Sequence, residues 1–228
     1  MIVLLVPYRD REENSKVFIE HMLKFFSDTL QGPVVIFITE QVGDRPFNRG
    51  ALINAGFLEV NKALNDTQGV VYVAHDIDML PIDPKISYID ISNNTIKHIY
   101  GPSHSLGGIC SFNKDVFEKI NGFPNNYWGW GREDVCLLHR VKSQNVLIDN
   151  SLFYKRPSPK HFRELPPNQK RTWSKGDYDE KNRLLQDEIE NPEYYKYNGL
   201  NTIQYVVKEK NYQSEGGNSI FFQKIYIF

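Results

Sequence analysis

Residues 121–134 of this chain read NGFPNNYWGWGRED, so that a tyrosine and two tryptophans lie among three glycines and end at an acidic pair. Glycines spaced this closely do not sustain a helix or a strand, and we expect a loop here. Flat aromatic faces beside carboxylates suit a sugar ring and its hydroxyl groups. The stretch therefore predicts a sugar-binding loop.

The acidic pair, Glu133 and Asp134, lies in the first turn of a predicted helix over residues 132–143. Apolar residues recur there at helical spacing, at Val135, Leu137, Leu138 and Val141. The positive end of the helix dipole favours ionised carboxylates in the first turn. We therefore expect one of the two acids to accept a proton from a hydroxyl group.

Strand and helix patterns alternate along the first third of the chain. Short apolar runs predict strands over residues 2–7, 34–38 and 69–74, and helical spacing predicts helices over residues 14–26 and 49–64. This alternation indicates an α/β fold with a mostly parallel central sheet flanked by helices. Ligands of such sheets bind at the carboxyl ends of the strands. The arginines after the first strand and the aspartates after the third fall at that edge.

Composition limits the possible partners. A chain of 228 residues fits one domain, so we expect residues 1–228 to form a single catalytic domain. A net charge of -1 gives no general attraction to nucleic acid, and two cysteines provide no disulfide framework and no CxxC metal motif. The apolar start, residues 1–6, is too short to anchor the chain in a membrane. We expect a cytoplasmic protein, or a Golgi-lumen one if the chain is a fragment of an anchored enzyme.

The loop at residues 121–134 and four further segments resemble the inverting β-1,4-galactosyltransferase family and occur in the family's order. The four segments are VPYRDR (6–11), FNRGALINAGF (47–57), HDIDMLP (75–81) and the Gly-Gly pair with SFNK (107–114). The resemblance runs from about residue 3 to GLNT at 199–202, and it is slightly closer to the xylosylprotein branch. It implies a GT-A type nucleotide-sugar-binding fold. It also implies transfer of galactose from UDP-galactose to the 4-hydroxyl of a xylose, N-acetylglucosamine or glucose acceptor on a glycan or glycoconjugate.

The resemblance assigns roles to the residues of the loop and the helix start. Asp134 matches the family's general base, which deprotonates the acceptor hydroxyl. Glu133 is expected to orient the acceptor or the donor sugar, and Trp130 to close as a lid that excludes water. Tyr127 and Trp128, together with Asp134, are expected to contact the acceptor sugar.

The donor site is expected at the ends of the first and third predicted strands. Tyr8 offers a flat ring, and Arg9 and Arg11 offer forked donors, which suit uracil and phosphate respectively. A helix start capped by Asp10 explains the same segment and is compatible with that role. The resemblance extends the expected donor pocket to the following residues: Pro7, Phe47, Arg49, Asp76, Ser105, Gly107 and Gly108.

Asp76 and Asp78 end the third predicted strand, where two carboxylates suit a hard cation. The resemblance assigns Asp78 to Mn²⁺, with Mg²⁺ as an alternative, and Asp76 to the ribose. His161 is the candidate second ligand. The xylose-accepting branch has a His-x-His pair there, and Pro159 stands at the first position, so a surface-loop histidine fits His161 equally well.

Two departures from the family bear on the substrates. Val135 stands where most relatives have a second aspartate, which removes one hydrogen-bond acceptor for the acceptor sugar. Ser105 stands where relatives have an aromatic residue, which leaves room for an N-acetyl group and makes UDP-N-acetylgalactosamine an alternative donor. A catalytically weakened sugar-binding protein is the alternative from another class.

Overall fold

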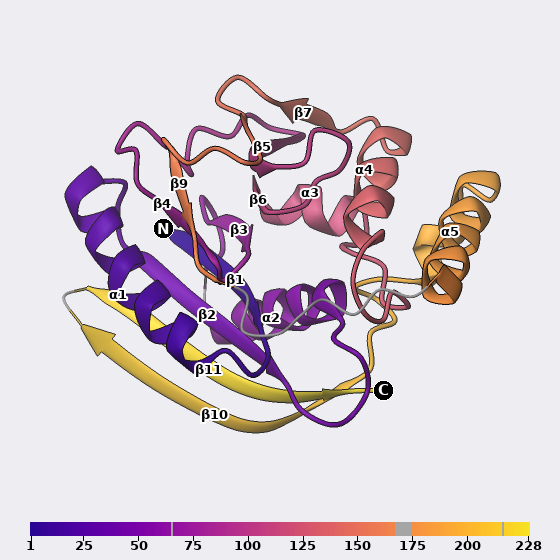
Figure 1. The fold of residues 1–228 in the computed structure, drawn as a ribbon, viewed down its shortest axis with the longest axis horizontal. Helices are drawn as coiled ribbons and strands as arrows, with labels where there is room; N and C mark the ends of the chain where they lie inside the picture. Colours follow the sequence, from indigo (N-terminus) through magenta and orange to yellow (C-terminus); the bar gives the residue numbers. More distant parts are fainter. Residues whose placement is uncertain (65, 167–174, 216) are drawn as a thin grey trace.

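The computed structural model describes residues 1–64, 66–166, 175–215 and 217–228 (Figure 1). Its main sheet has nine strands, in the order β10-β11-β2-β1-β3-β6-β5-β7 with β8 paired to β5, and β4 and β9 form a separate two-stranded sheet. The strands are β1 Ile2–Tyr8, β2 Val34–Gln41, β3 Val71–His75, β4 Met79–Pro81, β5 Thr95–Gly101, β6 Ile109–Phe112, β7 Leu147–Asp149, β8 Tyr154–Lys155, β9 Phe162–Glu164, β10 Tyr205–Glu215 and β11 Asn218–Ile227. The helices are α1 Glu12–Thr29, α2 Arg49–Ala63, α3 Lys114–Lys119, α4 Glu133–Ser143 and α5 Lys175–Glu190, with a short 3-10 turn, η1, at Tyr194–Tyr197.

The predicted α/β class is confirmed at the centre of the sheet. β1 pairs in parallel with both β2 and β3, and every residue of β1 is buried. A strand of a parallel sheet is buried on both faces when helices cover both sides of the sheet. Phe18 and Met22 of α1 pack with one face of β1, while Ile53 and Phe57 of α2 pack with the other. The two helices thus hold the strand ends in place.

The sheet is mixed beyond this parallel centre. β6 runs antiparallel to β3 and β5, and β10 runs antiparallel to β11. β11 lies parallel to β2, so the C-terminal hairpin, yellow in Figure 1, extends the sheet next to a strand from the start of the chain. None of the motifs in the sequence analysis indicates that placement.

The turn between β5 and β6 requires glycine because two backbone segments approach each other closely there. Gly108 has a φ of +80°, and a Cβ at this position would lie 2.3 Å from the Tyr100 carbonyl oxygen. A side chain is therefore excluded by both the backbone conformation and the lack of space. The same turn contacts the first turn of α4, where the Leu106 N–H donates to the Asp134 carbonyl at 3.2 Å.

The first half of the aromatic loop is held by the GLNT segment. Gly199 lies so close to Asn121 that a Cβ would be 1.9 Å from the Asn121 carbonyl oxygen. The Asn125 backbone N–H donates to the Asn198 side chain at 2.8 Å, and Asn54 of α2 donates to the Phe123 carbonyl at 2.7 Å. These polar contacts fix the loop that leads into α4. Among the described residues, no helix is long and apolar enough to cross a membrane.

Candidate active site

A buried charge cluster joins the starts of two helices to the end of β3. Arg49, the first residue of α2, donates to Asp76 Oδ1 at 2.6 Å, and its Nη1 lies 4.0 Å from Glu133 Oε1. Burial alone would lower the pKa of Arg49, but the Asp76 and Glu133 carboxylates outweigh it and raise that pKa above its usual value. The guanidinium therefore stays charged and binds both acids to the carboxyl edge of the sheet.

Glu133 and Arg49 each have a buried polar atom that makes no hydrogen bond among the described residues. Within the part of the chain that the structure describes, Glu133 Oε2 and Arg49 Nη1 make no hydrogen bond. Burial, followed by the neighbouring Asp134 carboxylate, raises the pKa of Glu133 to about 7. Unpaired buried polar atoms are uncommon in folded proteins and call for an explanation. An acceptor oxygen beside a donor nitrogen can be satisfied by the hydroxyl groups of a sugar.

Asp134 is held by contacts to both of its side-chain oxygens. Ser105 Oγ donates to Oδ2 at 2.7 Å, and the Val135 backbone N–H donates to Oδ1 at 2.9 Å. The Leu106 N–H donates to the Asp134 carbonyl at 3.2 Å. The carboxylate is half-buried, which leaves it open to a substrate hydroxyl. A carboxylate held in one orientation can act as a general base.

The two predicted metal ligands lie at opposite ends of the β4–β9 ladder. The Leu165 N–H donates to the Asp78 carbonyl, whereas the Ile82 N–H donates to the His161 carbonyl. Asp78 and Ile82 flank the three residues of β4, and the four residue steps between them correspond to roughly 13 Å in extended strand. His161 instead contacts Ser158 at 2.8 Å through Nδ1. The structure therefore does not bring His161 to Asp78, because the register of the two strands separates them.

Asp78 alone of the two predicted ligands lies at the end of β3. Its side chain is mostly buried and accepts from Arg11 Nη1 at 3.1 Å. Among the described residues, no group of three or more histidine, cysteine or acidic side chains is arranged to hold a metal. The position and chemistry of Asp78 fit one oxygen ligand of a hard cation.

A second cluster beside Asp78 escaped the sequence interpretation. Glu164 is paired with Met79 across the ladder and accepts from the Tyr100 hydroxyl. It also accepts two hydrogen bonds from the Arg156 guanidinium, at 2.7 and 2.9 Å. Desolvation lowers the pKa of Arg156, but Glu164 and Asp78 outweigh it and raise that pKa. These residues come from β5, β9 and the segment after β8, so no sequence motif marks them.

Two of the expected donor-site residues, at the end of β1, are buried. Pro7 and Tyr8 are buried, and the Tyr8 ring packs edge-on against Phe222, with ring centres 5.6 Å apart. Arg9 donates to the carbonyls of Arg45 and Gly43, so its guanidinium holds the segment between β2 and α2. Phe222 of β11 thus contacts the Tyr8 ring, and the role of that ring in holding uracil stays a prediction.

The three aromatic residues of the loop have different surroundings. Tyr127 is only 1% exposed, so the expected contact with an acceptor sugar is corrected: its side chain packs inside the protein, near Cys136. Trp128 is half-buried, with the Arg45 guanidinium 3.5 Å from its ring centre. Trp130 is 57% exposed. Trp130 is therefore the aromatic residue of this loop that is open to a ligand.

Helix α5 and the residue Phe47 hold the aromatic loop from both sides. Lys181 Nζ donates to the Trp130 carbonyl at 2.8 Å, and the Arg132 guanidinium lies 4.6 Å from the Tyr178 ring centre. On the other side, the Gly129 N–H donates to the Phe47 carbonyl at 2.8 Å. The α5 contacts were missed from the sequence, because helix α5 carries no motif that pairs it with the loop.

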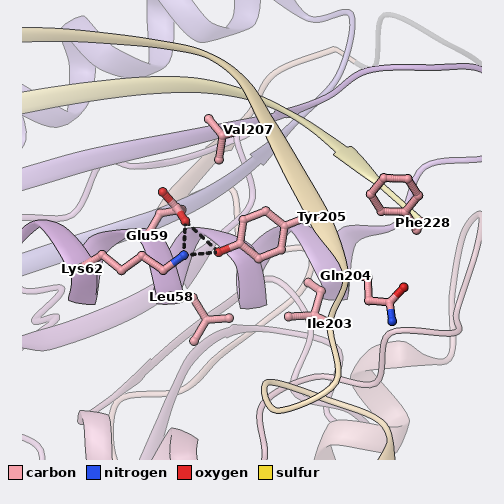
Figure 2. Close-up of a pocket in the computed structure, with 8 residues that line it drawn as sticks. All are labelled: Leu58, Glu59, Lys62, Ile203, Gln204, Tyr205, Val207 and Phe228. Atoms are coloured by element: carbon pink, nitrogen blue, oxygen red, sulfur yellow. Dashed lines mark hydrogen bonds and ion pairs between the residues drawn. The ribbon is translucent and has the colours of Figure 1, made fainter.

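A hollow of about 620 Å³ lies away from these residues, between α2 and the start of β10 (Figure 2). Glu59 accepts there from Lys62 at 2.7 Å and from the Tyr205 hydroxyl at 2.7 Å. No residue predicted from the sequence as a site residue lines it. The hollow is lined by Leu58, Glu59, Lys62, Ile203, Gln204, Tyr205, Val207 and Phe228.

Two family models match adjacent parts of the chain. Residues 1–90 match the N-terminal region of glycosyl transferase group 7, and residues 89–164 match a model described as the N-terminal domain of galactosyltransferase. Human β-1,4-galactosyltransferase 7 is 32% identical over 95% of this chain, and the chain spans 64% of that protein's length. The xylosylprotein 4-beta-galactosyltransferase of Caenorhabditis elegans is 28% identical over 96% of the chain and 75% of that protein.

Crystal structures of Drosophila β-1,4-galactosyltransferase 7 share this fold. A complex of the catalytic domain with xylobiose has a TM-score of 0.79 at 23% identity and covers 100% of this chain and 94% of that one. A mutant complex with manganese, UDP-Gal and xylobiose has a TM-score of 0.73 at 22% identity, with the same coverage. This likeness confirms the GT-A type fold.

Proposed function

This chain belongs to glycosyl transferase group 7, the galactosyltransferase family, and we propose that it transfers galactose from UDP-galactose to the 4-hydroxyl group of an acceptor sugar. The observation that carries the proposal is Asp134, held through both carboxylate oxygens at the start of α4. Strands from both matched segments share one sheet, which supports residues 1–228 acting as a single catalytic domain.

The reaction needs one base and no covalent enzyme intermediate. The Asp134 carboxylate takes the proton of the acceptor 4-hydroxyl as its oxygen attacks the anomeric carbon of the donor sugar. The bond from that carbon to the UDP oxygen breaks on the opposite face, and UDP leaves with the bonding electron pair. Attack opposite to the leaving group inverts the configuration at that carbon.

Neighbouring residues orient the two sugars around Asp134. Glu133 Oε2 and Arg49 Nη1, which make no hydrogen bond among the described residues, are an acceptor and a donor for sugar hydroxyl groups, so binding would satisfy both. Trp130, exposed on a loop with glycines on both sides, would close over the donor and exclude water. We assign Trp128 a supporting role, because Arg45 already stacks on its ring.

A divalent cation, Mn²⁺ or Mg²⁺, would be held by Asp78 in this chain. When bound, the ion supplies positive charge that stabilises the leaving diphosphate. The Arg11 guanidinium, 3.1 Å from Asp78, adds fixed positive charge at the same place. Asp76 is paired with Arg49 and is proposed to contact the ribose.

The names of the related proteins favour a xylose-type acceptor, as on a glycan or glycoconjugate. Human and fly relatives are β-1,4-galactosyltransferases 7, and the fly structures contain xylobiose. UDP-N-acetylgalactosamine stays as the alternative donor, because Ser105 is small where the family has an aromatic residue. A weakened sugar-binding protein is the second candidate function, since Val135 replaces the family's second aspartate.

The test is release of UDP by purified protein with Mn²⁺, given each donor in turn with xyloside, glucosaminide and glucoside acceptors. Asp134→Asn keeps the shape of the side chain but removes the base, and Asp28→Asn on the exposed face of α1 is the matched control. We expect turnover that Asp134→Asn reduces about 10³-fold and Asp28→Asn leaves unchanged. Equal turnover by Asp134→Asn contradicts the proposed base. Metal-dependent UDP binding without turnover on any acceptor favours the sugar-binding candidate.

A further inference from the structure

The turn between β5 and β6 contacts Asp134 through Ser105, Leu106 and Gly107, and these three residues are called the Asp134 seat. Ser105 Oγ donates to Asp134 Oδ2 at 2.7 Å, and the Leu106 backbone N–H donates to the Asp134 carbonyl at 3.2 Å. The Gly107 N–H lies 3.4 Å from Ser105 Oγ, where it can donate to that oxygen. Three consecutive residues of one turn thus contact the proposed base directly or through its hydroxyl partner.

Gly107 provides the space that the carboxylate occupies. A Cβ on Gly107 would lie 2.4 Å from Asp134 Oδ2, well inside van der Waals contact. The backbone of Gly107 is not in the left-handed region, so glycine is required here because space is lacking and not because of its backbone conformation. The atom that a Cβ would meet is the end of the Asp134 side chain. An added methyl group would therefore displace the carboxylate and spare the fold.

The two hydrogen bonds on the carboxylate together fix its rotation. Oδ1 is held by the Val135 N–H of its own helix, and Oδ2 is held by a hydroxyl from a different element. Without the Ser105 hydroxyl, the Asp134 carboxylate keeps, among the described residues, the bond from its own helix alone, and its side chain gains rotational freedom. A base that is held in one orientation needs no reorganisation when the acceptor hydroxyl arrives.

We propose that Ser105 and Gly107 seat the Asp134 carboxylate, and that Ser105 is a positioning residue for the transfer through its hydroxyl group. This inference rests on the proposed function. It differs from the expectation that Ser105 matters only because it is small and widens the donor pocket. Ser105 is 2% exposed, so its hydroxyl is buried and its bond to Asp134 is shielded from water.

Two substitutions at Ser105 separate the hydroxyl from the size of the side chain. Ser105→Ala removes the hydrogen bond and leaves at least as much room for an N-acetyl group. Ser105→Thr keeps the hydroxyl and takes up room with one more methyl group. Gly107→Ala tests the seat independently, by displacing the carboxylate while Ser105 stays intact.

The experiment measures kcat and KM with UDP-galactose and with UDP-N-acetylgalactosamine for these three variants, with UDP affinity by calorimetry and a melting temperature for each. For Ser105→Ala we expect kcat to fall about tenfold with both donors, because one hydrogen bond to a charged group is lost. We expect the donor KM and the UDP affinity to stay within about twofold, and Ser105→Thr to retain kcat with UDP-galactose. Gly107→Ala is expected to lower kcat further than Ser105→Ala.

Other results overturn the inference. If Ser105→Ala leaves kcat unchanged and alters only the ratio of the kcat/KM values for the two donors, the role of Ser105 is purely steric. Equal losses in Ser105→Ala and Ser105→Thr, with lowered melting temperature and UDP affinity, assign it a structural one. An unsubstituted protein that binds UDP but turns over no donor contradicts the proposed function itself, and is thereby distinguished from a failure of the seat.

Discussion

Replacing Arg140 with methionine is expected to destabilise the protein strongly, because Arg140 carries a buried ion pair between α4 and α5. Its guanidinium donates to both carboxylate oxygens of Glu188, and Arg140 and Glu188 are 0% and 2% exposed. It also donates to the Gly122 carbonyl at 3.0 Å and to the Asn198 carbonyl at 2.7 Å. One side chain thus joins two helices, the start of the aromatic loop and the residue that precedes the GLNT segment.

The magnitude follows from what the substitution leaves behind. Removing one partner of a buried ion pair typically costs about 3–5 kcal/mol, because the remaining charge loses its counter-charge in a water-free place. Two carbonyls also lose a donor, at about 1 kcal/mol each. We therefore expect a loss of about 5 kcal/mol or more in the free energy of unfolding, and a fall in melting temperature of roughly 10–20 °C for a chain of this size.

The assay is urea denaturation followed by circular dichroism, with thermal melts in parallel. The double variant Arg140→Met with Glu188→Leu is the matched control, because it removes both charges and keeps the volume of both side chains close to the original. We expect it to recover most of the loss from the ion pair. A loss below about 1 kcal/mol in Arg140→Met, or a double variant as unstable as the single one, refutes the reasoning.

Three further predictions concern pH, packing and the loop. Glu133 has a pKa raised to about 7 from 4.5, so its protonated form is favoured on folding; the stability this provides is complete below pH 4.5 and is lost as pH rises through 7. Denaturant titrations should show that the free energy of unfolding is lower at pH 8 than at pH 5, and that this difference is absent in Glu133→Gln. Gly199→Ala places a Cβ 1.9 Å from the Asn121 carbonyl and should cost about 1–3 kcal/mol by thermal melts; an unchanged melting temperature contradicts this contact. Lys181→Met removes the bond to the Trp130 carbonyl and should raise the donor KM roughly fivefold in steady-state assays, unlike Lys208→Met on β10.

The core of the fold was predictable from the sequence because its signals are local. Apolar runs and helical spacing located β1, α1, β2, α2, β3 and α4 to within about three residues of their observed bounds. Parallel strands joined by helices then placed the arginines after β1 and the aspartates after β3 at one edge of the sheet, whereas Arg49 was assigned to the donor pocket by the family resemblance. The contacts of Arg49 with Asp76 and Glu133 also depend on where α2 and α4 begin beside the end of β3, which the strand pattern alone does not specify.

The misplaced side chains depend on interactions that sequence spacing does not encode. A tyrosine in a glycine-rich loop can point inward or outward, and the surroundings contributed by α4 and α5 decide that Tyr127 is buried. Likewise, β4 and β9 are three residues long, and no residue pattern sets the register of so short a pair. That register, and not the motif, separates His161 from Asp78.

The placement of β11 beside β2 has a consequence for the order in which the chain folds. The Val34 backbone N–H donates to the Asn218 side chain, 184 positions away, so one edge of β2 obtains its partner only from the last strand of the chain. Contacts so distant in sequence close slowly, because a large loop must be ordered first. During synthesis, β2 therefore has an open hydrogen-bonding edge until the C-terminal hairpin emerges, and that edge is where a nascent chain is most open to pairing with another.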